Sequence, residues 1–324
     1  MEDPLISSMR FFSDQQLCYA DILSPSEARS TENRSRRAQF PQDLDFSFSG
    51  NIRSSFVWKV MEMSYKILSQ EKRVTQRELF YKLICDSPDY FSSQLEVNRT
   101  IQDVVALLRC SRYSLGIMAS SRGLVAGRLL LQEPNQEVVD CSVCGSSGHA
   151  ISGDLNLLDK LILKTDARYI IVVEKHAIFQ RLTEDGFFNQ VPSILITAKG
   201  YPDIATRLLL HRMSRAFPEL PILALVDWYE QLLSLVTEPV TLWLGLRRDD
   251  LQFILEESLV PLKPKDLQIA KSLMSSEILP ENYKEELTFM VQSGQRAEIE
   301  ALYCHGYDFL RKFMANKIVQ ANYI

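Results

Sequence analysis

The sequence predicts an α+β domain followed by an α/β domain with a parallel sheet. Between residues 56 and 131 the chain shows three helical patterns and then alternating apolar residues, which is typical of an α+β domain. After residue 155, short apolar strands alternate with helical stretches, which is typical of a parallel sheet covered by helices. The length of 324 residues agrees, because it corresponds to about two domains of ordinary size.

The composition indicates a soluble protein of a reducing compartment. Hydrophobic residues make up 46% of the chain and charged residues 24%, which suffices for a buried core. No apolar run approaches the ~18 residues of a membrane span. The start, Met1-Glu2-Asp3-Pro4, lacks the pattern of a signal peptide, so we expect neither membrane association nor secretion. The six cysteines are too few for a disulfide framework in a chain of this length.

Charge is divided unevenly along the chain. The formal net charge of −5 and the pI of about 5.6 argue, taken alone, against a nucleic-acid binder. Residues 56–130, however, hold 11 basic and 7 acidic residues, whereas residues 131–324 hold 19 and 26. A basic region beside an acidic one suggests that the first contacts a polyanion and that the second holds cations.

The first 55 residues are expected to contain a short helix and a linker. Ser13, with Gln16 three residues later, is a capping-box pattern that predicts a helix within residues 1–29. Residues 30–50 are rich in Ser, Arg and Asp and have no hydrophobic period, which is typical of a linker.

Residues 56–140 are predicted to form a winged helix-turn-helix domain. The first helix covers 56–69, and capping boxes that begin at Thr75 and Ser93 open the second and third helices. Together with the positive charge of this region, three helices followed by a wing favour a DNA-binding module. A small α+β domain of no special function is the alternative.

The wing is predicted from the residues after the third helix. Tyr113, Leu115 and Ile117 alternate as in a strand, residues 120–123 have turn composition, and residues 124–131 run back as a second strand. This pattern predicts a two-stranded hairpin within the first domain.

Residues 166–324 are predicted to form the α/β domain, after a connector at 141–165 that ends in a helix over 155–164. The expected elements are, in chain order, strand 169–173, helix 176–184, strand 193–198, helix 203–216 and strand 222–226. Beyond Trp243 the chain is expected to be mostly helical. Repeated strand–helix units with continuously apolar strands imply a parallel, Rossmann-like sheet with helices on both faces.

Two acidic residues directly follow predicted parallel strands. Glu174 follows the strand at 169–173, and Asp227 follows the strand at 222–226. Ligands of open α/β sheets bind at the carboxyl ends of the strands, and neighbouring strands place two such carboxylates about 5 Å apart. Oxygen ligands at this spacing suit Mg²⁺. The alternative is that acidic residues simply follow strands in loops.

Tyr81 is predicted to be exposed on the second helix. The apolar stripe of that helix consists of Leu79, Phe80, Leu83 and Ile84, and Tyr81 points about 130° away from its centre. An exposed phenol on a basic region can stack, donate a hydrogen bond or attack a phosphate. Because free tyrosine has a pKa of about 10, attack needs a nearby arginine and a metal on the phosphate. An ordinary surface tyrosine is the alternative.

One cysteine pair has the spacing of a zinc half-site. Cys141 and Cys144 form a CxxC motif, and His149 follows five residues later. A structural zinc site needs four ligands, and the sequence shows no second pair. Unligated loop thiols are therefore the favoured interpretation, and a zinc-dependent regulator is the alternative.

Several sequence blocks resemble one family in their order and spacing. The blocks are Arg77-Glu78-Leu79-Phe80-Tyr81, Cys110-Ser111-Arg112, Val173-Glu174-Lys175, Lys199-Gly200-Tyr201-Pro202-Asp203-Ile204-Ala205-Thr206-Arg207, and an apolar strand that leads to Asp227. They resemble the topoisomerase VI A-subunit family, which includes its eukaryotic homologue, the meiotic double-strand-break protein. The resemblance covers roughly residues 56–228 and resumes at Trp243.

The resemblance implies a winged-helix domain with a nucleophilic tyrosine and a Toprim domain that binds Mg²⁺. It implies that Tyr81 attacks a DNA phosphodiester and forms a 5′-phosphotyrosyl link, and that the resulting double-strand breaks initiate meiotic recombination. Glu174 and Asp227 match the metal-binding carboxylates, and Arg77 and Arg112 are the candidates for phosphate contact. The implied partners are double-stranded DNA, a topoisomerase VI B-like subunit, and a second copy or a paralogue, all in the nucleus.

The chain departs from the family after Asp227. The family continues there with an acidic or amide residue two positions later, whereas this chain has Tyr229. Only 15 residues separate Asp227 from Trp243, where the family has a much longer segment. We therefore expect a deletion between 228 and 243 and an incomplete Toprim domain. The alternative function is a catalytically impaired variant that binds DNA or dimerises.

Overall fold

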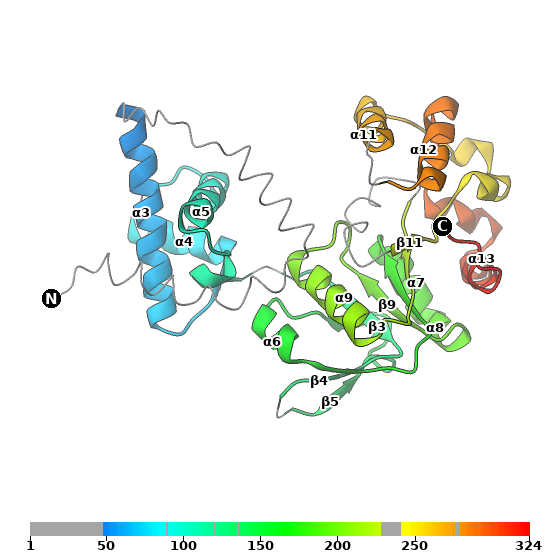
Figure 1. Cartoon of the computed structure of the whole chain (residues 1–324), viewed down its shortest axis with the longest axis horizontal. Coiled ribbons are helices and arrows are strands. Elements are labelled where there is room, and N and C mark those ends of the chain that lie inside the picture. The colour runs from blue at the N-terminus through cyan, green and yellow to red at the C-terminus, as the bar shows by residue number, and fades with distance from the viewer. Residues whose placement is uncertain (1–47, 89, 119–120, 135, 228–240, 276–278) are drawn as a thin grey trace. The chain divides into compact units, whose positions relative to one another are not determined.

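The computed structural model describes residues 48–88, 90–118, 121–134, 136–227, 241–275 and 279–324. They form two compact units that divide between residues 120 and 121, each with its own hydrophobic core. In Figure 1, unit 1 is coloured blue and cyan, and unit 2 is coloured mainly green, yellow and red. The helix predicted within residues 1–29 lies outside the described residues, as does the linker predicted at 30–50 except for residues 48–50.

The described part of unit 1 is a cluster of helices with one pair of very short strands. Its elements are α3 (Phe48–Ser69), β1 (Val74–Thr75), α4 (Gln76–Asp86), α5 (Gln94–Leu108), the 3₁₀ helix η2 (Tyr113–Leu115) and β2 (Ile117–Met118). Each long helix contributes fully buried side chains to one core, for example Val60, Leu79 and Ile101. Burial of each such side chain contributes roughly 1.5–3 kcal/mol, so this core holds the three helices together.

The predicted helix starts at Thr75 and Ser93 are confirmed. The hydroxyl of Thr75 accepts a hydrogen bond of 3.1 Å from the backbone N–H of Glu78, and Ser93 accepts one of 3.3 Å from Glu96. The first helix begins earlier than predicted, at Phe48 rather than at residue 56. Gly50 and the serines around it have the composition of a linker, but their helix propensities are only about 1 kcal/mol or less below that of alanine.

The predicted wing is wrong. Tyr113–Leu115 form a 3₁₀ turn, and β2 pairs in parallel with β1, Val74 facing Ile117. The expected return strand, β3 (Leu124–Gly127), instead pairs with β6 (His149–Ala150) and β9 (Ser193–Thr197) of unit 2. Alternating apolar residues indicate a strand, but they do not indicate the strand with which it pairs. The pattern therefore predicted a local hairpin for β3, whose partners are in fact β6 and β9. The division between 120 and 121 consequently differs from the boundary expected at residue 140.

Unit 2 is built on a six-stranded sheet in the order β11-β10-β8-β9-β3-β6. The strands not yet given are β8 (Tyr169–Val173), β10 (Ile222–Leu225) and β11 (Thr241–Trp243). Strands β8, β9, β10 and β11 run parallel to one another, and β3 is antiparallel to its neighbours β9 and β6. The predicted parallel sheet and its three predicted strands are thus confirmed, with ends within one residue of the prediction.

Helices cover both faces of this sheet, as predicted. The helices are α7 (His176–Glu184), α8 (Phe187–Gln190) and α9 (Ile204–Ala216). Val173 and Leu195 share a core with Phe179 of α7, whereas Val172 and Ile196 point to the opposite face and are also buried. Figure 1 shows α9 on one side of the strands and α7 with α8 on the other. This double burial explains why the strands are apolar at nearly every position.

The expected connector at 141–165 belongs to unit 2 rather than lying between two domains. Strands β4 (Leu130–Gln132), β5 (Val138–Asp140) and β7 (Ile162–Lys164) form an antiparallel sheet in the order β5-β4-β7. The predicted helix at 155–164 is confirmed only as α6 (Leu155–Lys160), because the chain turns at Leu161 and continues as β7.

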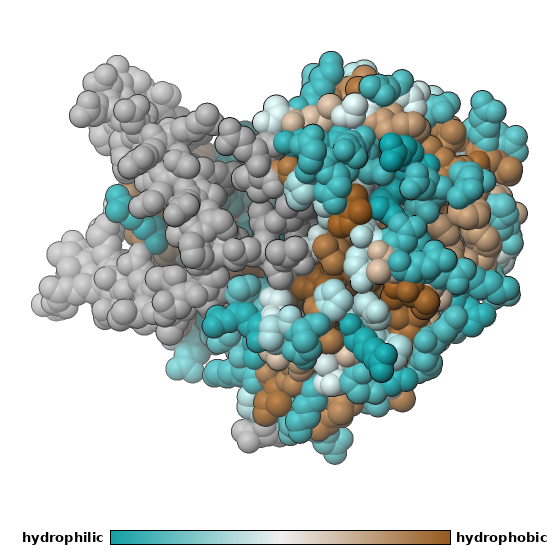
Figure 2. Space-filling model, turned by 45° about the vertical axis from the view of Figure 1, so that its right-hand side comes forward, coloured by the Kyte–Doolittle hydropathy of each residue, from teal (hydrophilic) through white to brown (hydrophobic). Residues whose placement is uncertain are grey.

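The C-terminal part is mostly helical, as predicted, and completes the core of unit 2. Its elements are η3 (Arg248–Phe253), η4 (Glu256–Ser258), β12 (Val260–Pro261), α11 (Pro264–Met274), α12 (Glu281–Ser293), β13 (Gln295–Arg296), η5 (Ile299–His305) and α13 (Tyr307–Val319). Leu310 and Met314 of α13 are fully buried in the core that contains Phe179. Among the described helices, none is both long and apolar enough to span a membrane. Figure 2 shows hydrophobic residues interspersed with hydrophilic ones on the face it presents.

Candidate functional site

Tyr81 lies on the exposed side of α4, as predicted. Leu79 and Leu83 of the same helix are completely buried, whereas the side chain of Tyr81 is 53% exposed. Arg77, one helical turn earlier, places its guanidinium carbon 5.9 Å from the centre of the Tyr81 ring. A cation over an aromatic face is attracted by the ring quadrupole, so the pair presents a phenol and a positive charge together on one surface.

Arg112 lies in the same unit, directly before the 3₁₀ helix η2. Its carbonyl accepts hydrogen bonds from the backbone N–H groups of Leu115 and Ile117, at 3.1 Å each, and these bonds fix the turn. Its side chain is half-buried, and this burial lowers the pKa of the guanidinium from its ordinary value. A desolvated guanidinium forms stronger hydrogen bonds to an anion than an exposed one does.

Glu174 and Asp227 each follow a parallel strand, as predicted, and the structure shows that the two strands are neighbours. Val173 of β8 pairs with Leu225 of β10, and the backbone N–H of Glu174 donates to the carbonyl of Leu225 at 3.0 Å. The backbone N–H of Asp227 donates to Oε2 of Glu174 at 2.9 Å. The first carboxylate therefore fixes the backbone that carries the second.

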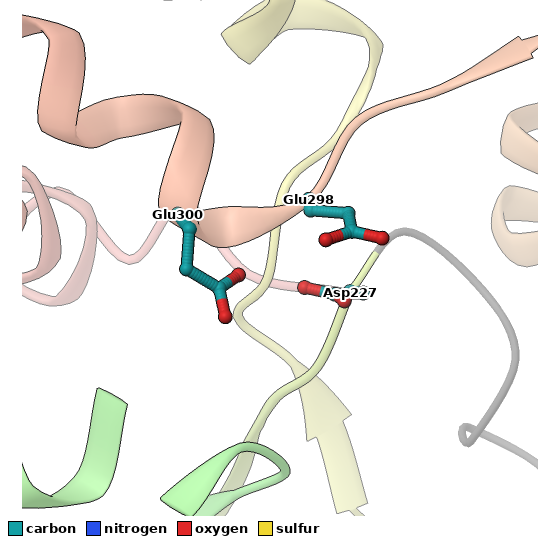
Figure 3. Close-up of side chains that lie close together, drawn as sticks. All are labelled: Asp227, Glu298 and Glu300. Atoms are coloured by element: carbon teal, nitrogen blue, oxygen red, sulfur yellow. The ribbon is translucent and has the colours of Figure 1, made fainter. Parts of the chain in front are cut away.

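Asp227 also meets two acidic residues that the sequence patterns did not indicate. One carboxylate oxygen from each of Asp227, Glu298 and Glu300 lies within 4.8 Å of the others, and Figure 3 shows the three side chains converging. The backbone N–H of Ile299 donates to Oδ1 of Asp227 at 3.0 Å, which brings the start of η5 to the sheet edge. In the described part of the chain this is the one such cluster of three His, Cys, Asp or Glu ligand atoms.

The chemistry of this carboxylate cluster, Asp227 with Glu298 and Glu300, fits a divalent cation. Carboxylate oxygens are the ligands that hard divalent ions prefer, and an octahedral ion completes its shell with water. Glu174 is not a member of the cluster, but its carboxylate holds the backbone of Asp227 in place. Nothing in the local sequence of Glu298 or Glu300 indicates a return to the sheet edge, about 70 residues after Asp227.

Lys175 places its ammonium group among the same carboxylates. Its Nζ lies 2.7 Å from Asp227 and 3.2 Å from Glu298, and it also contacts Glu300. Burial alone would lower the pKa of Lys175, but its hydrogen bonds to Asp227 and Glu300 raise that pKa above its ordinary value. For Asp227, burial raises the pKa and the Lys175 ammonium opposes that shift. The lysine is therefore charged and partly neutralises the cluster.

The loop at 199–203 packs beside Glu174 and opens α9. The backbone N–H of Gly200 donates to the carbonyl of Glu174 at 3.0 Å, and Gly200 has a φ of +112°, which favours glycine. Asp203 accepts a hydrogen bond of 2.8 Å from Thr206, as an N-cap does, and a second of 2.8 Å from the N–H of Arg122. This loop thus joins the end of β8, the start of α9 and the segment before β3.

The CxxC motif does not assemble a ligand set in the described part of the chain. Cys141 is buried, and burial raises the pKa of its thiol to about 12. The thiol of Cys144 donates to the carbonyl of Asp140 at 3.3 Å. His149 lies in β6 and, among the described residues, belongs to no group of three metal-ligating residues.

Comparison with known proteins identifies a matching family profile in each of the two units. The family profile for the Toprim domain of the topoisomerase 6 A-subunit/Spo11 proteins matches residues 169–318, and the profile for type IIB DNA topoisomerases matches residues 53–117. "Meiotic recombination protein SPO11-2" of Arabidopsis thaliana is 60% identical, and the alignment covers 98% of each chain. This chain belongs to the topoisomerase VI A-subunit/Spo11 family.

Relatives from other branches of the family agree. The A-type subunit of DNA topoisomerase 6 from Arabidopsis thaliana is 32% identical over 86% of this chain and 68% of its own length. "Meiotic recombination protein SPO11" of Homo sapiens is 32% identical over 82% of this chain and 70% of its own length. The parallel sheet of unit 2 is accordingly the Toprim sheet, and the resemblance seen in the sequence is confirmed.

The alignment also indicates that the SPO11-2 relative has additional residues, and that these lie within the aligned region. It extends over 377 residues, although this chain has only 324 and is covered to 98%. The relative therefore contains internal residues without a counterpart here. Tyr229 and the deletion expected between 228 and 243 fall almost entirely on residues 228–240, which lie outside the described residues. Even so, β11 pairs in parallel with β10, Ile222 facing Thr241.

Proposed function

We propose that this chain is a DNA-cleaving transesterase that makes double-strand breaks through a 5′-phosphotyrosyl intermediate and thereby initiates meiotic recombination. The observation that carries the proposal is the exposed phenol of Tyr81 with the guanidinium of Arg77 over its ring. Family membership supports it, because relatives over nearly the whole chain are named meiotic recombination proteins.

The proposed reaction exchanges one phosphoester for another. Oη of Tyr81 attacks the phosphorus of a DNA phosphodiester, the bond from phosphorus to the 3′ oxygen breaks, and the 5′ phosphate stays on the tyrosine. The phenol loses its proton to solvent or a base, and the departing 3′ oxygen gains one, so no water is consumed. Arg77 and Arg112 would contact the phosphate oxygens, where guanidinium groups stabilise the charge that develops.

The proposed cofactor is Mg²⁺, held by Asp227 with its neighbouring carboxylates. Bound there, it would offset negative charge on the DNA phosphate. Asp227 would supply a ligand oxygen, and Glu174 keeps Asp227 in position through the 2.9 Å hydrogen bond from the backbone N–H of Asp227. Glu298, directly before η5, and Glu300, within η5, would add further oxygens.

The proposed partners follow from the same family membership. Unit 1, with α4 and α5 opened by side-chain caps, is proposed to be the helical module that meets double-stranded DNA. The small surplus of basic residues within residues 56–120, 9 against 7 acidic ones, would favour that contact, because phosphate neutralisation drives DNA binding. As protein partners we further propose a second copy or a paralogue, together with a B-like subunit of topoisomerase VI type, and the nucleus as the compartment.

A catalytically impaired variant is the second candidate function. Two observations favour it: the chain lacks internal residues that its SPO11-2 relative has, and the ammonium of Lys175 already neutralises part of the carboxylate cluster. This candidate predicts DNA binding, or dimerisation, without covalent chemistry.

A covalent-adduct assay separates the two candidates. The full chain, with its B-like partner, is incubated with duplex DNA and Mg²⁺, denatured, and analysed for DNA bound to protein. We expect an adduct in the wild type and none in Tyr81→Phe, whereas Tyr65→Phe, an exposed tyrosine on α3, serves as the matched control and retains it. An undiminished adduct in Tyr81→Phe would overturn the assignment of the nucleophile. DNA binding without adduct in the wild type would establish the impaired variant.

A further inference from the structure

Lys175 places its ammonium in contact with all three carboxylates that could hold a metal ion. It immediately follows Glu174, so β8 delivers it to the same sheet edge as Asp227. Its ammonium contacts all three carboxylates of the cluster, and only 23% of its side chain is exposed. The lysine is therefore part of the site and not a surface residue that passes near it.

The cluster keeps a net negative charge even with the lysine present. Three carboxylates whose oxygens lie within 4.8 Å of one another repel strongly in a partly buried site. One ammonium compensates one of these charges, and Arg296, 3.6 Å from Glu298, compensates part of another. The negative charge that remains attracts a divalent cation.

The ammonium and a divalent cation compete for these oxygens. Mg²⁺ binds carboxylate oxygens at about 2.0–2.1 Å, whereas Nζ of Lys175 already lies 2.7 Å from Asp227 and 3.2 Å from Glu298. Both cations on the same oxygens would be only a few ångströms apart, where their mutual repulsion in a partly buried site is strong. This repulsion disfavours the binding of both cations at once.

We propose that Lys175 is the internal counter-ion of the carboxylate cluster and that a divalent cation binds there by exchange, displacing the ammonium. The lysine thereby keeps the three carboxylates close together while no metal is bound. It also raises the metal concentration that is needed for binding. The inference rests on the proposed function only in that a divalent cation is the expected occupant. Lys175 is a positioning residue, since it acts through the ligands.

Exchange makes a quantitative prediction about metal affinity. The cation must first break the hydrogen bonds of a charged group. The apparent affinity is therefore the intrinsic affinity multiplied by the fraction of time for which the ligands are free of the lysine. Hydrogen bonds to charged groups have typical net strengths that correspond to roughly ten- to hundredfold in an equilibrium constant. Removing the ammonium should therefore tighten metal binding by about tenfold or more.

Calorimetric titration of the metal-free full chain with MnCl₂ and MgCl₂ tests this prediction. Lys175→Met removes the charge at similar length and should lower the Kd on the order of tenfold. Lys175→Arg keeps a cation and should bind no tighter than the wild type. Lys312→Met, which removes an exposed lysine of α13, controls for the loss of one positive charge and should leave the Kd unchanged.

A second measurement uses the wild type and does not depend on a variant that folds. Reductive dimethylation of lysines, quantified by peptide mass spectrometry, reports how accessible each ammonium is. Saturating Mg²⁺ should raise the labelling of Lys175 several-fold and leave Lys312 unchanged. Labelling of Lys175 that does not rise as the metal binds contradicts the exchange, as does a Lys175→Met protein that binds metal no better than the wild type or not at all.

These outcomes are distinct from a failure of the proposed function. A protein that shows the exchange but forms no DNA adduct would confirm the counter-ion and reject the transesterase. A protein that forms the Tyr81 adduct but shows no exchange would confirm the transesterase and reject the counter-ion. Thermal unfolding by circular dichroism verifies that Lys175→Met is folded before its Kd is compared.

Discussion

The backbone N–H of Asp227 donates a hydrogen bond of 2.9 Å to Oε2 of Glu174. This bond joins the ends of two neighbouring parallel strands, β8 and β10, at the edge where the sheet presents its acidic residues. Glu174 in turn has its own N–H bonded to Leu225. The orientation of Asp227 therefore depends on the carboxylate of Glu174.

Substitutions at Glu174 should separate its structural role from its charge. Glu174→Ala removes the acceptor of the Asp227 N–H, and leaving such a group unpaired in a partly buried site costs about 1–3 kcal/mol. Glu174→Gln keeps an acceptor oxygen and should recover most of that stability, but both variants lose a negative charge and should bind Mn²⁺ more weakly. Urea unfolding and metal titration provide the two readouts. Equal stability of the Ala and Gln variants would show that the hydrogen bond contributes nothing.

Tyr81→Phe should leave the fold of unit 1 unchanged. The tyrosine is 53% exposed, and the core of its helix is formed by the buried Leu79 and Leu83. Removing an exposed hydroxyl typically changes the free energy of unfolding by less than about 0.5 kcal/mol. By contrast, Leu83→Ala creates a cavity and should cost about 2–5 kcal/mol. Urea unfolding of both variants checks the contrast, and a large loss in Tyr81→Phe would make the adduct assay uninterpretable for that variant.

Local sequence patterns predicted the elements whose signals lie within a few residues. The strands at 169–173 and 222–226 are buried on both faces and are therefore continuously apolar, which allowed their ends to be read from the sequence. The starts of α4 and α5 followed from Thr75 and Ser93, because a capping side chain bonds to the backbone only three residues away. The exposure of Tyr81 followed from helical geometry alone.

Long-range pairing was the part that sequence patterns could not give. Val125 of β3 faces Ile196 of β9, about 70 residues later, and no local feature distinguishes this partner from a hairpin. Glu298 and Glu300 reach Asp227 by the same kind of long return. Lys175 was visible only as part of a family block, because its role depends on three carboxylates that the fold brings together.

The thiol of Cys141 should resist alkylation as long as the protein is folded. Burial raises its pKa to about 12, so at pH 8 only about one molecule in 10⁴ carries the reactive thiolate. Cys85 and Cys304 are exposed and should react with iodoacetamide under conditions in which Cys141 of the folded protein does not. Peptide mass spectrometry of native and urea-treated protein measures the difference. Rapid labelling of native Cys141 only after addition of a chelator would indicate a bound metal and revive the zinc interpretation.

The buried pair of Lys317 and Asp250 should help to hold α13 against the rest of unit 2. Nζ of Lys317 lies 2.5 Å from Asp250 and donates to the carbonyl of Gly245 at 2.9 Å, and both side chains are at most 6% exposed. Lys317→Ala leaves a buried carboxylate without its partner, which costs about 3–5 kcal/mol. Hydrogen exchange of α13 peptides and urea unfolding should both report the loss.

The double variant Lys317→Met with Asp250→Asn tests whether the cost arises from the unpaired charge. It removes both charges and keeps most of the volume, so it should be more stable than Lys317→Ala. Lys312→Ala, on the exposed side of the same helix, should change stability by no more than about 0.5 kcal/mol. If the double variant is as unstable as the single one, the lost contact with Gly245, and not the stranded carboxylate, dominates the cost.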